Sequence, residues 1–280
     1  MTYLIIGKDG QLGKEFLKFF DKSGNKYFAF NHKELDISNL NDVISCFEAI
    51  KPEIVINASA YNQVDLAEKN FDEAYRSNAL GVHNLLFAGK KFNSLLIHFS
   101  TDYVFDGKKE NGLYTELDSV NPLSQYGKSK YLGEAFVMKS LDNSLLFRTS
   151  WVFGDGKQNF IYKFLEWSNK NNILKVTSDE VSIPTHTKII VDVTLKAIEQ
   201  KVRGLFHLTS SSYCSRYELA KFITNSLNLK NIVYPVPIAS FNLPAKRPEF
   251  SPMDNKKISD LLGISIPSWQ ESVKDYVESL

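Results

Sequence analysis

The chain has 280 residues, with 33 Lys and Arg against 32 Asp and Glu, so its formal net charge is only +1. That balance excludes a global positive field for nucleic acid or an acidic membrane. Hydrophobic residues make up 43%, which predicts a globular protein with a sizeable core. Two cysteines, Cys46 and Cys214, without a CxxC motif indicate a reducing compartment. The opening residues carry no basic leader, and no stretch reaches the roughly 20 apolar residues of a membrane span, so we expect a cytoplasmic protein.

The first predicted element is a strand, Tyr3–Ile6, which leads into a loop with Gly7, Gly10 and Gly13 and then a helix over Leu12–Phe20. Glycines let the backbone bend and approach a ligand, and a helix N-terminus offers free N–H groups to a pyrophosphate. Strand, glycine loop and helix in this order therefore predict a dinucleotide-binding turn. The alternative is a tight turn without a ligand.

The second predicted strand, Lys26–Phe30, is followed by Asn31-His32-Lys33 and then Glu34. NAD-dependent enzymes usually carry an acidic residue near this point, which holds the ribose 2′-hydroxyl. Basic residues in its place favour NADP(H), whereas the nearby Glu34 leaves NAD(H) open. Asp36-Ile37 then leads into a helix over Leu40–Ile50.

Small side chains, Ala58-Ser59-Ala60, follow the third predicted strand, Glu53–Asn57. They would let a flat cofactor lie against the strand end; close packing of a helix at this point is the alternative. One long helix is expected over Phe71–Lys91, carrying Asn78.

The fourth predicted strand, Leu95–Phe99, ends in Ser100-Thr101-Asp102. The carboxyl edge of an open α/β sheet is where ligands bind. The Thr101 hydroxyl could therefore bond a substrate carbonyl, and Asp102 could orient a sugar hydroxyl. A helix cap is the alternative, but no helical pattern follows Asp102.

Tyr126 and Lys130 stand four residues apart at the start of a predicted helix that runs through Glu134. At that spacing the two side chains share one face of the helix. A phenol has a pKa near ~10, which a nearby ammonium would lower. The pair could then give or take a proton at a carbonyl carbon that exchanges hydride with a nicotinamide. The alternative is a solvated helix face.

Strand and helix alternate up to the fifth predicted strand, Ser144–Arg148, which predicts an α/β fold: a Rossmann-type, doubly wound parallel sheet with a smaller C-terminal cap. We expect residues 1–150 to form a dinucleotide-binding domain and residues 151–280 mainly a substrate-binding domain, with a segment near 186–203 returning to the first. The later predicted elements are helices at Phe160–Asn169, Ile189–Gln200, Arg216–Leu227 and Trp269–Val277 and strands at Leu174–Thr177 and Gly204–Leu208.

Together these residues resemble the extended short-chain dehydrogenase/reductase family and, within it, the dTDP-4-dehydrorhamnose reductases. The resemblance covers the chain from Met1 to the C-terminal tail. The motifs that carry it are Gly7–Gly13, Asp36-Ile37, Ser100–Gly107, Tyr126–Lys130 with Gly133-Glu134, and Arg148–Gly154.

The resemblance implies NADPH-dependent reduction of the C4 ketone of dTDP-4-dehydrorhamnose to dTDP-L-rhamnose, a precursor of surface polysaccharide. The implied catalytic set is Thr101, Tyr126 and Lys130. The implied cofactor set is Gly7, Gly10, Gln11, Leu12 and Gly13 at the pyrophosphate, Asp36 and Ile37 near the adenine, and Ala58, Ser59, Ala60, Tyr126 and Lys130 along the rest of the cofactor. The implied sugar set is Thr101, Asp102 and Trp151, with the Trp151 indole facing the deoxyhexose or, alternatively, packed in the core.

The substrate's diphosphate needs a cation, and Arg247 is the candidate because a planar guanidinium can bind phosphate oxygens in a bidentate way. A surface ion pair is the alternative for Arg247. The five histidines, which show no metal-binding spacing and are expected to be structural, are His32, His83, His98, His186 and His207.

Two segments depart from the family pattern. Asp179-Glu180-Val181-Ser182-Ile183-Pro184-Thr185 stands where the family has Asp-Gln-x-Gly-x-Pro-Thr, and Asn62 replaces the usual Thr. Both segments are expected near the substrate. Some relatives bind Mg²⁺ through glutamates at a dimer interface; Glu15 matches one position, the others cannot be placed, and we predict no metal site. A homodimer is left open.

Two alternatives stay open at this point. One is another extended reductase, epimerase or dehydratase that acts on a different nucleotide sugar. The other is a non-catalytic regulatory subunit on the same fold, which would bind a partner enzyme and turn over no ketosugar.

Overall fold

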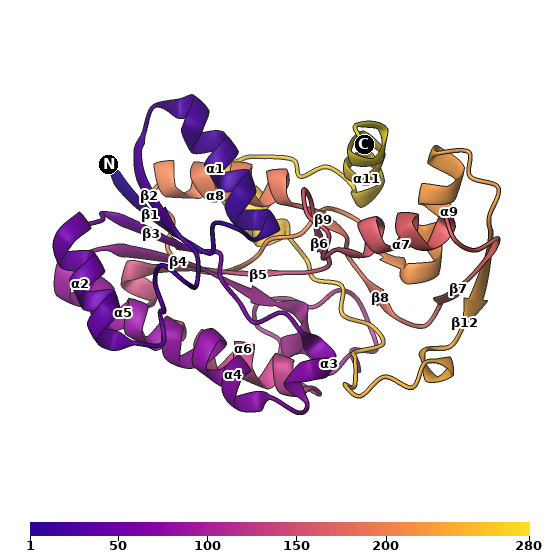
Figure 1. Ribbon diagram of the computed structural model, residues 1–280, viewed down its shortest axis with the longest axis horizontal. Coiled ribbons are helices and arrows are strands. Elements are labelled where there is room, and N and C mark those ends of the chain that lie inside the picture. Colours follow the sequence, from indigo (N-terminus) through magenta and orange to yellow (C-terminus); the bar gives the residue numbers. More distant parts are fainter.

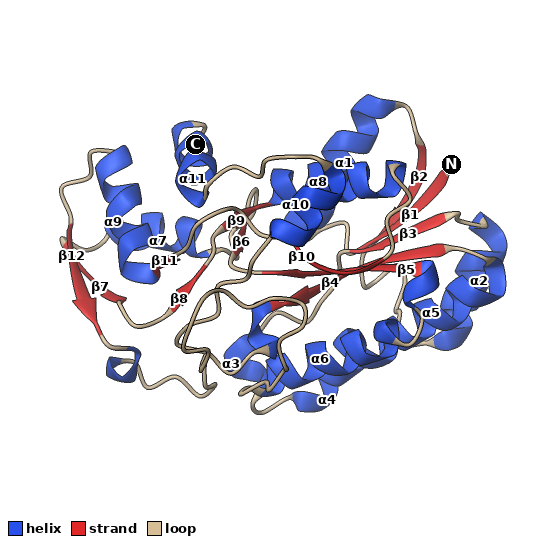
Figure 2. Cartoon of the chain, turned by 180° about the vertical axis from the view of Figure 1, so that it is seen from behind, coloured by secondary structure: helices blue, strands red, loops and turns tan.

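Six parallel strands form the central sheet of the computed structural model, which describes residues 1–280. Their order across the sheet is β10-β5-β4-β3-β1-β2 (Figures 1 and 2). The predicted doubly wound parallel sheet is confirmed. The chain reverses its direction of winding between β1 and β3, which is where such sheets bind ligands. The strands are β1 (Thr2–Ile6), β2 (Lys26–Phe30), β3 (Ile54–Asn57), β4 (Leu95–Thr101), β5 (Ser144–Thr149) and β10 (Gly204–His207).

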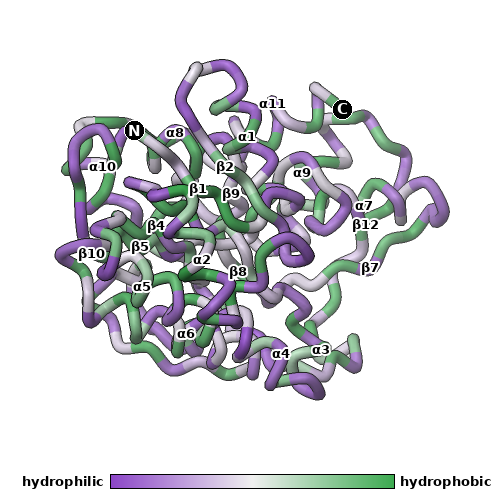
Figure 3. Tube along the Cα trace, turned by 60° about the vertical axis from the view of Figure 1, so that its left-hand side comes forward, coloured by the Kyte–Doolittle hydropathy of each residue, from purple (hydrophilic) through white to green (hydrophobic).

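Helices cover both faces of the sheet. Its strands are therefore nearly continuous runs of apolar residues, because side chains on both faces are buried. Tyr3 and Ile5 of β1 pack into one core cluster, and Leu4 and Ile6 pack into another on the opposite face. Figure 3 shows hydrophobic segments running through the strands and hydrophilic ones in many outer loops. Helices α1 (Gln11–Ser23), α8 (Thr187–Glu199) and α10 (Lys256–Leu262) cover the first face, and α2 (Leu40–Ile50), α5 (Gly81–Phe92) and α6 (Gln125–Met138) cover the second.

The single helix expected over Phe71–Lys91 is wrong, because the chain forms α4 (Phe71–Tyr75), a π-helical turn at Arg76–Leu80, and then α5. The cause lies in the turn, where the Asn78 side chain bonds both backbone groups of Tyr61, at 2.8 and 3.1 Å. A Cβ on Gly133 of α6 would stand 2.0 Å from the Asn78 carbonyl oxygen. The close approach of α6 to this turn therefore requires glycine.

A smaller unit at the other end of the molecule has its own core, in which Phe164 and Trp269 are buried (Figure 1). Two of its strands, β7 and β12, pair in parallel. The sequence analysis missed β12, which contains Pro235, and the short helix α10. The elements of this part are α7 (Phe160–Ser168), α9 (Arg216–Ser226), α11 (Trp269–Glu278), β7 (Ile173–Thr177) and β12 (Ile232–Val236), with the short strands β6 (Val152–Phe153), β8 (Val181–Ser182), β9 (Thr185–His186) and β11 (Cys214–Ser215).

Several segments from the second half of the chain belong to the sheet's layers. Ile190 of α8 and Ile258 of α10 lie in the same core cluster as Phe16 of α1, and β10 is the sixth strand. The division of the chain at residue 150 stays a prediction. None of the helices is both long and apolar enough to span a bilayer.

Candidate active site

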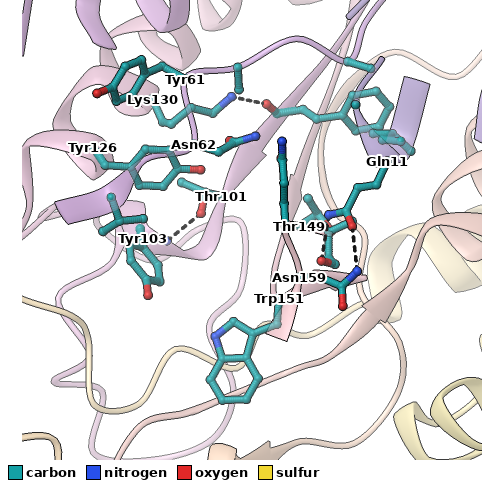
Figure 4. Close-up of a pocket in the computed structure, with 18 of the residues that line it drawn as sticks. Gln11, Tyr61, Asn62, Thr101, Tyr103, Tyr126, Lys130, Thr149, Trp151 and Asn159 are labelled. Carbon is teal, nitrogen blue, oxygen red and sulfur yellow. Dashed lines mark hydrogen bonds between the residues drawn. The ribbon is translucent and has the colours of Figure 1, made fainter. Parts of the chain in front are cut away.

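The carboxyl edge of the sheet opens into a cavity of about 570 Å³ that holds Thr101, Tyr126 and Lys130 (Figure 4). Thr101 ends β4, and Tyr126 and Lys130 come from the first turns of α6. The structure thus brings together all three side chains predicted to be catalytic. The other predicted site residues that line this cavity are Gly10, Gln11, Leu12, Ala58, Ser59, Ala60, Asp102 and Trp151.

A second cavity, of about 980 Å³, lies on the other side of the glycine turn. Gly7, Asp36 and Ile37 line it. The two cavities share Gly10, the segment 58–62 and Gln158, so they adjoin along the sheet edge, and we call the pair the trough. A trough of this kind fits an extended dinucleotide, with Asp36 and Ile37 at one end and Tyr126 at the other.

The glycine turn has the geometry that binding a pyrophosphate requires. Gly7 has φ +89°, and a Cβ there would stand 2.7 Å from the Ser59 nitrogen. Helix α1 begins after Gly10 with no side chain capping its N-terminus, which leaves the first N–H groups of the helix available to an anion. Gly13 lines neither cavity; a Cβ there would stand 2.1 Å from the Gly7 oxygen, so Gly13 lets α1 pack on the turn.

The Glu34 side chain, which follows β2, is held by two hydrogen bonds outside the trough. Its carboxylate accepts hydrogen bonds from Lys8 Nζ at 2.7 Å and from the Asn31 backbone at 2.9 Å. Glu34 does not line the trough, whereas Asn31, His32 and Lys33 do, and Arg76 lies on the same cavity wall. Lys33 and Arg76 therefore place two cations on a wall that also carries Asp9, Asp36 and Glu73.

Lys130 is buried, and its ammonium donates a hydrogen bond to the Phe99 carbonyl oxygen at 2.6 Å. Burial raises the pKa of Tyr126 to about 12, the nearby Thr101 hydroxyl acts to lower it, and the Asp102 carboxylate raises it further. The prediction that Lys130 lowers the pKa of Tyr126 is wrong in this arrangement, because the burial of the phenol outweighs its neighbours. Tyr126 is accordingly a neutral phenol at pH 7.

Burial also lowers the pKa of Lys130 to about 8, although the nearby Glu134 carboxylate acts to raise it. Glu134, one helical turn further along α6, pairs with Arg148 of β5 in a buried ion pair. Arg148 Nε lies 3.1 Å from each Glu134 oxygen, so the pair is bidentate in character. This contact fixes α6 to the central sheet.

Thr101 caps a short 3₁₀ turn at Asp102–Val104, because its hydroxyl accepts a hydrogen bond from the Tyr103 backbone at 3.2 Å. The expectation that no helical turn follows Asp102 is therefore wrong. The same hydroxyl lies 3.2 Å from Asp102 Oδ1, to which it donates. Thr101 is thus held in place while its oxygen still lines the cavity.

Asp102 is buried, and its carboxylate accepts hydrogen bonds from Ser182 at 2.8 Å and Ser251 at 2.6 Å. Burial raises the pKa of Asp102 to about 6, and the hydrogen bonds from Ser251, Ser182 and Thr101 act to lower it. One carboxylate at the end of β4 therefore ties the sheet edge to two segments of the second half of the chain.

Trp151 has an unusual backbone conformation, with φ +40°, directly after β5. The Arg216 guanidinium lies 3.5 Å above its ring, and Arg216 Nε is 3.7 Å from Glu180. The indole N–H is buried without a partner. One face of Trp151 is covered by Arg216, and the residue also lines the cavity that holds Thr101 (Figure 4).

Arg247 does not line the cavity. Its guanidinium pairs with Asp65, with Nη2 2.7 Å and Nη1 3.1 Å from the two carboxylate oxygens. The Ala245 carbonyl oxygen accepts a further bond from Nη1 at 2.9 Å. Its role as a phosphate ligand stays a prediction.

Several lining residues were missed by the sequence analysis. Thr149, paired with Thr101 across β4 and β5, has a buried hydroxyl without a partner at the cavity wall. Its position at a strand's carboxyl end was a usable signal. Other missed lining residues are Asn57, Tyr61, Gln63, Val64, Tyr103, Lys157, Gln158, Asn159 and Lys163. Asn62, one departure from the family pattern, lines both cavities.

Glu15 lies away from this site, in a separate cavity between α1, α8 and α11. Its carboxylate accepts a hydrogen bond from the Thr187 hydroxyl at 3.4 Å. No group of three or more His, Cys, Asp or Glu side chains in the chain is arranged to hold a metal ion.

Comparison with known proteins identifies the family. The family model of the RmlD substrate binding domain matches residues 1–280. A dTDP-4-dehydrorhamnose reductase from Aggregatibacter actinomycetemcomitans is 36% identical, over 97% of this chain and 97% of that protein. A solved reductase of the same name from Clostridium acetobutylicum has a TM-score of 0.96 at 37% identity, over 100% and 99% of the two chains. One from Bacillus anthracis, in complex with NADP, has a TM-score of 0.95 at 32% identity, over 100% and 99%. The chain belongs to the RmlD substrate binding domain family.

Proposed function

We propose that this protein is an NADPH-dependent reductase that converts the C4 ketone of dTDP-4-dehydrorhamnose to the alcohol of dTDP-L-rhamnose. The observation that carries the proposal is the convergence of Thr101, Tyr126 and Lys130 at one end of a trough that continues to a glycine turn. The similar proteins that bear this reductase name span nearly the whole chain.

The cofactor would lie along the trough. Its pyrophosphate would be held by the turn of Gly7 and Gly10 and by the N–H groups of Gln11 and Leu12. The adenosine end would lie against Asp36 and Ile37, and the segment 58–60 would line the cofactor's path. The Lys33 and Arg76 side chains favour NADP(H) over NAD(H), as does the pairing of Glu34 with Lys8, which takes that acid out of the cavity lining.

When bound, the reduced nicotinamide supplies a hydride to the ketone carbon. Tyr126 then donates its phenolic proton to the ketone oxygen, for which its neutral state at pH 7 suits it. The Thr101 hydroxyl, which donates to Asp102 in this structure, would turn its proton to that oxygen and stabilise the developing negative charge there. Lys130 places a buried positive charge at the same end of the cavity and would bond the ribose hydroxyls.

The deoxyhexose would bind between Thr101, Asp102 and Trp151. Trp151 would offer the indole face that Arg216 does not cover. Because Asp102 is bound by Ser182 and Ser251, it would act on the sugar through the oxygen that Thr101 contacts. Arg247 would have to leave Asp65, at least in part, to bind the substrate diphosphate.

Location and assembly are also proposals. Two free cysteines, Cys46 and Cys214, support a reducing compartment, and we propose the cytoplasm. We also propose that the protein binds neither nucleic acid nor membrane and forms a homodimer, which light scattering on the purified protein would test.

The function is tested by NADPH oxidation against a panel of nucleotide-linked 4-ketosugars, with the product stereocentre determined by NMR. We expect turnover with the dTDP-linked 6-deoxy-4-ketosugar and a product of the L-rhamno configuration. An epimerase or dehydratase would convert its sugar without net NADPH consumption, and a regulatory subunit would turn over none of the panel.

A further inference from the structure

The proposed reaction brings two diphosphates to the catalytic cavity, one in the cofactor and one in the nucleotide sugar. Each diphosphate is negatively charged, and a protein that binds it needs cationic side chains nearby. Lysine ammonium groups can serve, because they attract phosphate as compact positive charges. The cationic side chains that line the catalytic cavity are Lys130, Lys157 and Lys163. Lys130 is buried at the sheet end and bonded to Phe99, which leaves two lysines at the mouth.

We infer that Lys157 and Lys163 bind a diphosphate group at the mouth of the catalytic cavity. This inference rests on the proposed function, because that function brings the diphosphates to the site. Both lysines are exposed, and neither forms an ion pair within the protein. The neighbouring acid, Asp155, is instead paired with Lys18 of α1. The positive charge of both lysines is therefore free for a ligand.

Arg247 is a weaker candidate for the same charge. It lies outside the cavity lining, and its guanidinium is already neutralised by Asp65 through two contacts. Binding a phosphate would require that ion pair to loosen, whereas the two lysines have no partner to lose.

The loop that carries Lys157 is fixed to the glycine turn. Gln11 Nε2 donates to the Val152 carbonyl oxygen at 2.9 Å, and Asn159 Nδ2 lies 3.4 Å from Gln11 Oε1 (Figure 4). Asn159 also donates to the carbonyl oxygens of Gly154 and Gly156, at 2.9 and 3.0 Å. Gln11 is the first residue of α1, so this loop crosses the same helix end that would hold the cofactor pyrophosphate.

The loop lies where the two cavities meet, because its residue Gln158 lines both. Lys157 precedes it, and Lys163 lies four residues after Asn159 on α7, on the same helical face. Either diphosphate could reach ammonium groups placed here. The shared chemistry is a diphosphate at the junction, and binding measurements separate the two sources.

The experiment uses the full-length protein with Lys157→Gln, Lys163→Gln and the double substitution. Lys170→Gln is the matched control, because Lys170 is an exposed lysine just beyond α7 that does not line the cavity. Thermal melting first establishes that each variant is folded. Kd is then measured by fluorescence for NADPH and by calorimetry for thymidine diphosphate and for thymidine, each at low and high salt. None of these measurements needs turnover, so they remain informative if the proposed substrate is wrong.

We expect the double variant to bind one of the two diphosphate ligands roughly tenfold more weakly, with the deficit shrinking at high salt. A loss for NADPH alone assigns the lysines to the cofactor, and a loss for thymidine diphosphate but not thymidine assigns them to the nucleotide sugar. Lys→Arg variants should restore binding. Unchanged affinities for both ligands would overturn the inference, as would an equal loss in Lys170→Gln.

Discussion

The chemistry of the proposed site depends on two residues whose burial sets their protonation. Tyr126 is held neutral, with a pKa of about 12, and Lys130 loses its proton at a pKa of about 8, in both cases chiefly because burial disfavours the charged form. A neutral phenol suits the role of proton donor in a reduction. The charge of Lys130, by contrast, is sensitive to mildly alkaline pH.

We predict that kcat/KM for NADPH falls above about pH 8, as Lys130 loses the charge that the cofactor end of the site requires. Stability should move the other way. The unfolded chain binds more protons than the folded one between about pH 8 and the ordinary lysine pKa near ~10.4, so this residue's contribution to stability rises with pH there. A pH profile of kcat/KM beside urea unfolding at each pH checks both. An activity that stays flat to pH 10 would contradict this role of Lys130.

A second prediction concerns Lys33, which lines the adenosine end of the trough. Lys33→Gln should weaken NADPH binding by roughly tenfold and leave NADH binding unchanged, because only NADPH carries the 2′-phosphate. Kd for the two cofactors is the measurement. Lys26→Gln, at the opposite end of β2, serves as the control and should alter neither. Equal effects of Lys33→Gln on both cofactors would place the 2′-phosphate elsewhere.

At the scale of elements, contacts with β5 and with the π-helical turn hold α6 in place. Glu134 and Arg148 join it to β5, and Gly133 lets it approach the π-helical turn at Asn78. The Asn78 amide also donates to Ser129 at 2.9 Å, within the same first turns that carry Tyr126 and Lys130. These contacting residues hold the helix that carries Tyr126 and Lys130, and none of them lines the cavity.

We predict that Arg148→Met lowers the free energy of unfolding by roughly 3–5 kcal/mol, because it leaves the buried Glu134 carboxylate without a partner. Adding Glu134→Leu should recover most of that loss. Lys256→Met, which breaks the exposed pair with Asp260, is the control and should cost well under about 1 kcal/mol. Urea unfolding measures all of these. A loss in Arg148→Met no larger than in the control would show that the buried pair does not hold α6.

At the scale of the molecule, the parts that follow from local patterns were predictable. The apolar strands, the glycine turn and the order of elements each follow from a few consecutive residues. The parallel sheet predicted from them is confirmed. The misses have tertiary causes. The π-helical turn forms because Asn78 bonds Tyr61, a residue outside its own helix. The pKa of Tyr126 depends on the burial that only the assembled site produces.

The two ends of the molecule are joined at the site itself. Asp102 receives hydrogen bonds from Ser182 and Ser251, while Gln11 and the Val152 carbonyl join the glycine turn to the segment after β5. Residues of the sheet edge and Lys163 of α7 in the smaller unit both line the cavity that holds Tyr126. The smaller unit could therefore hold a substrate that is reduced at the sheet edge.

The central claim is that Tyr126 delivers the proton in a ketone reduction, and the rate of NADPH oxidation with dTDP-4-dehydrorhamnose tests it most directly. We predict that Tyr126→Phe lowers kcat by roughly 100-fold or more while the Kd of NADPH changes far less. Tyr131→Phe, on the same helix but outside the cavity, should turn over like the wild type. Near-wild-type turnover by Tyr126→Phe would contradict the account.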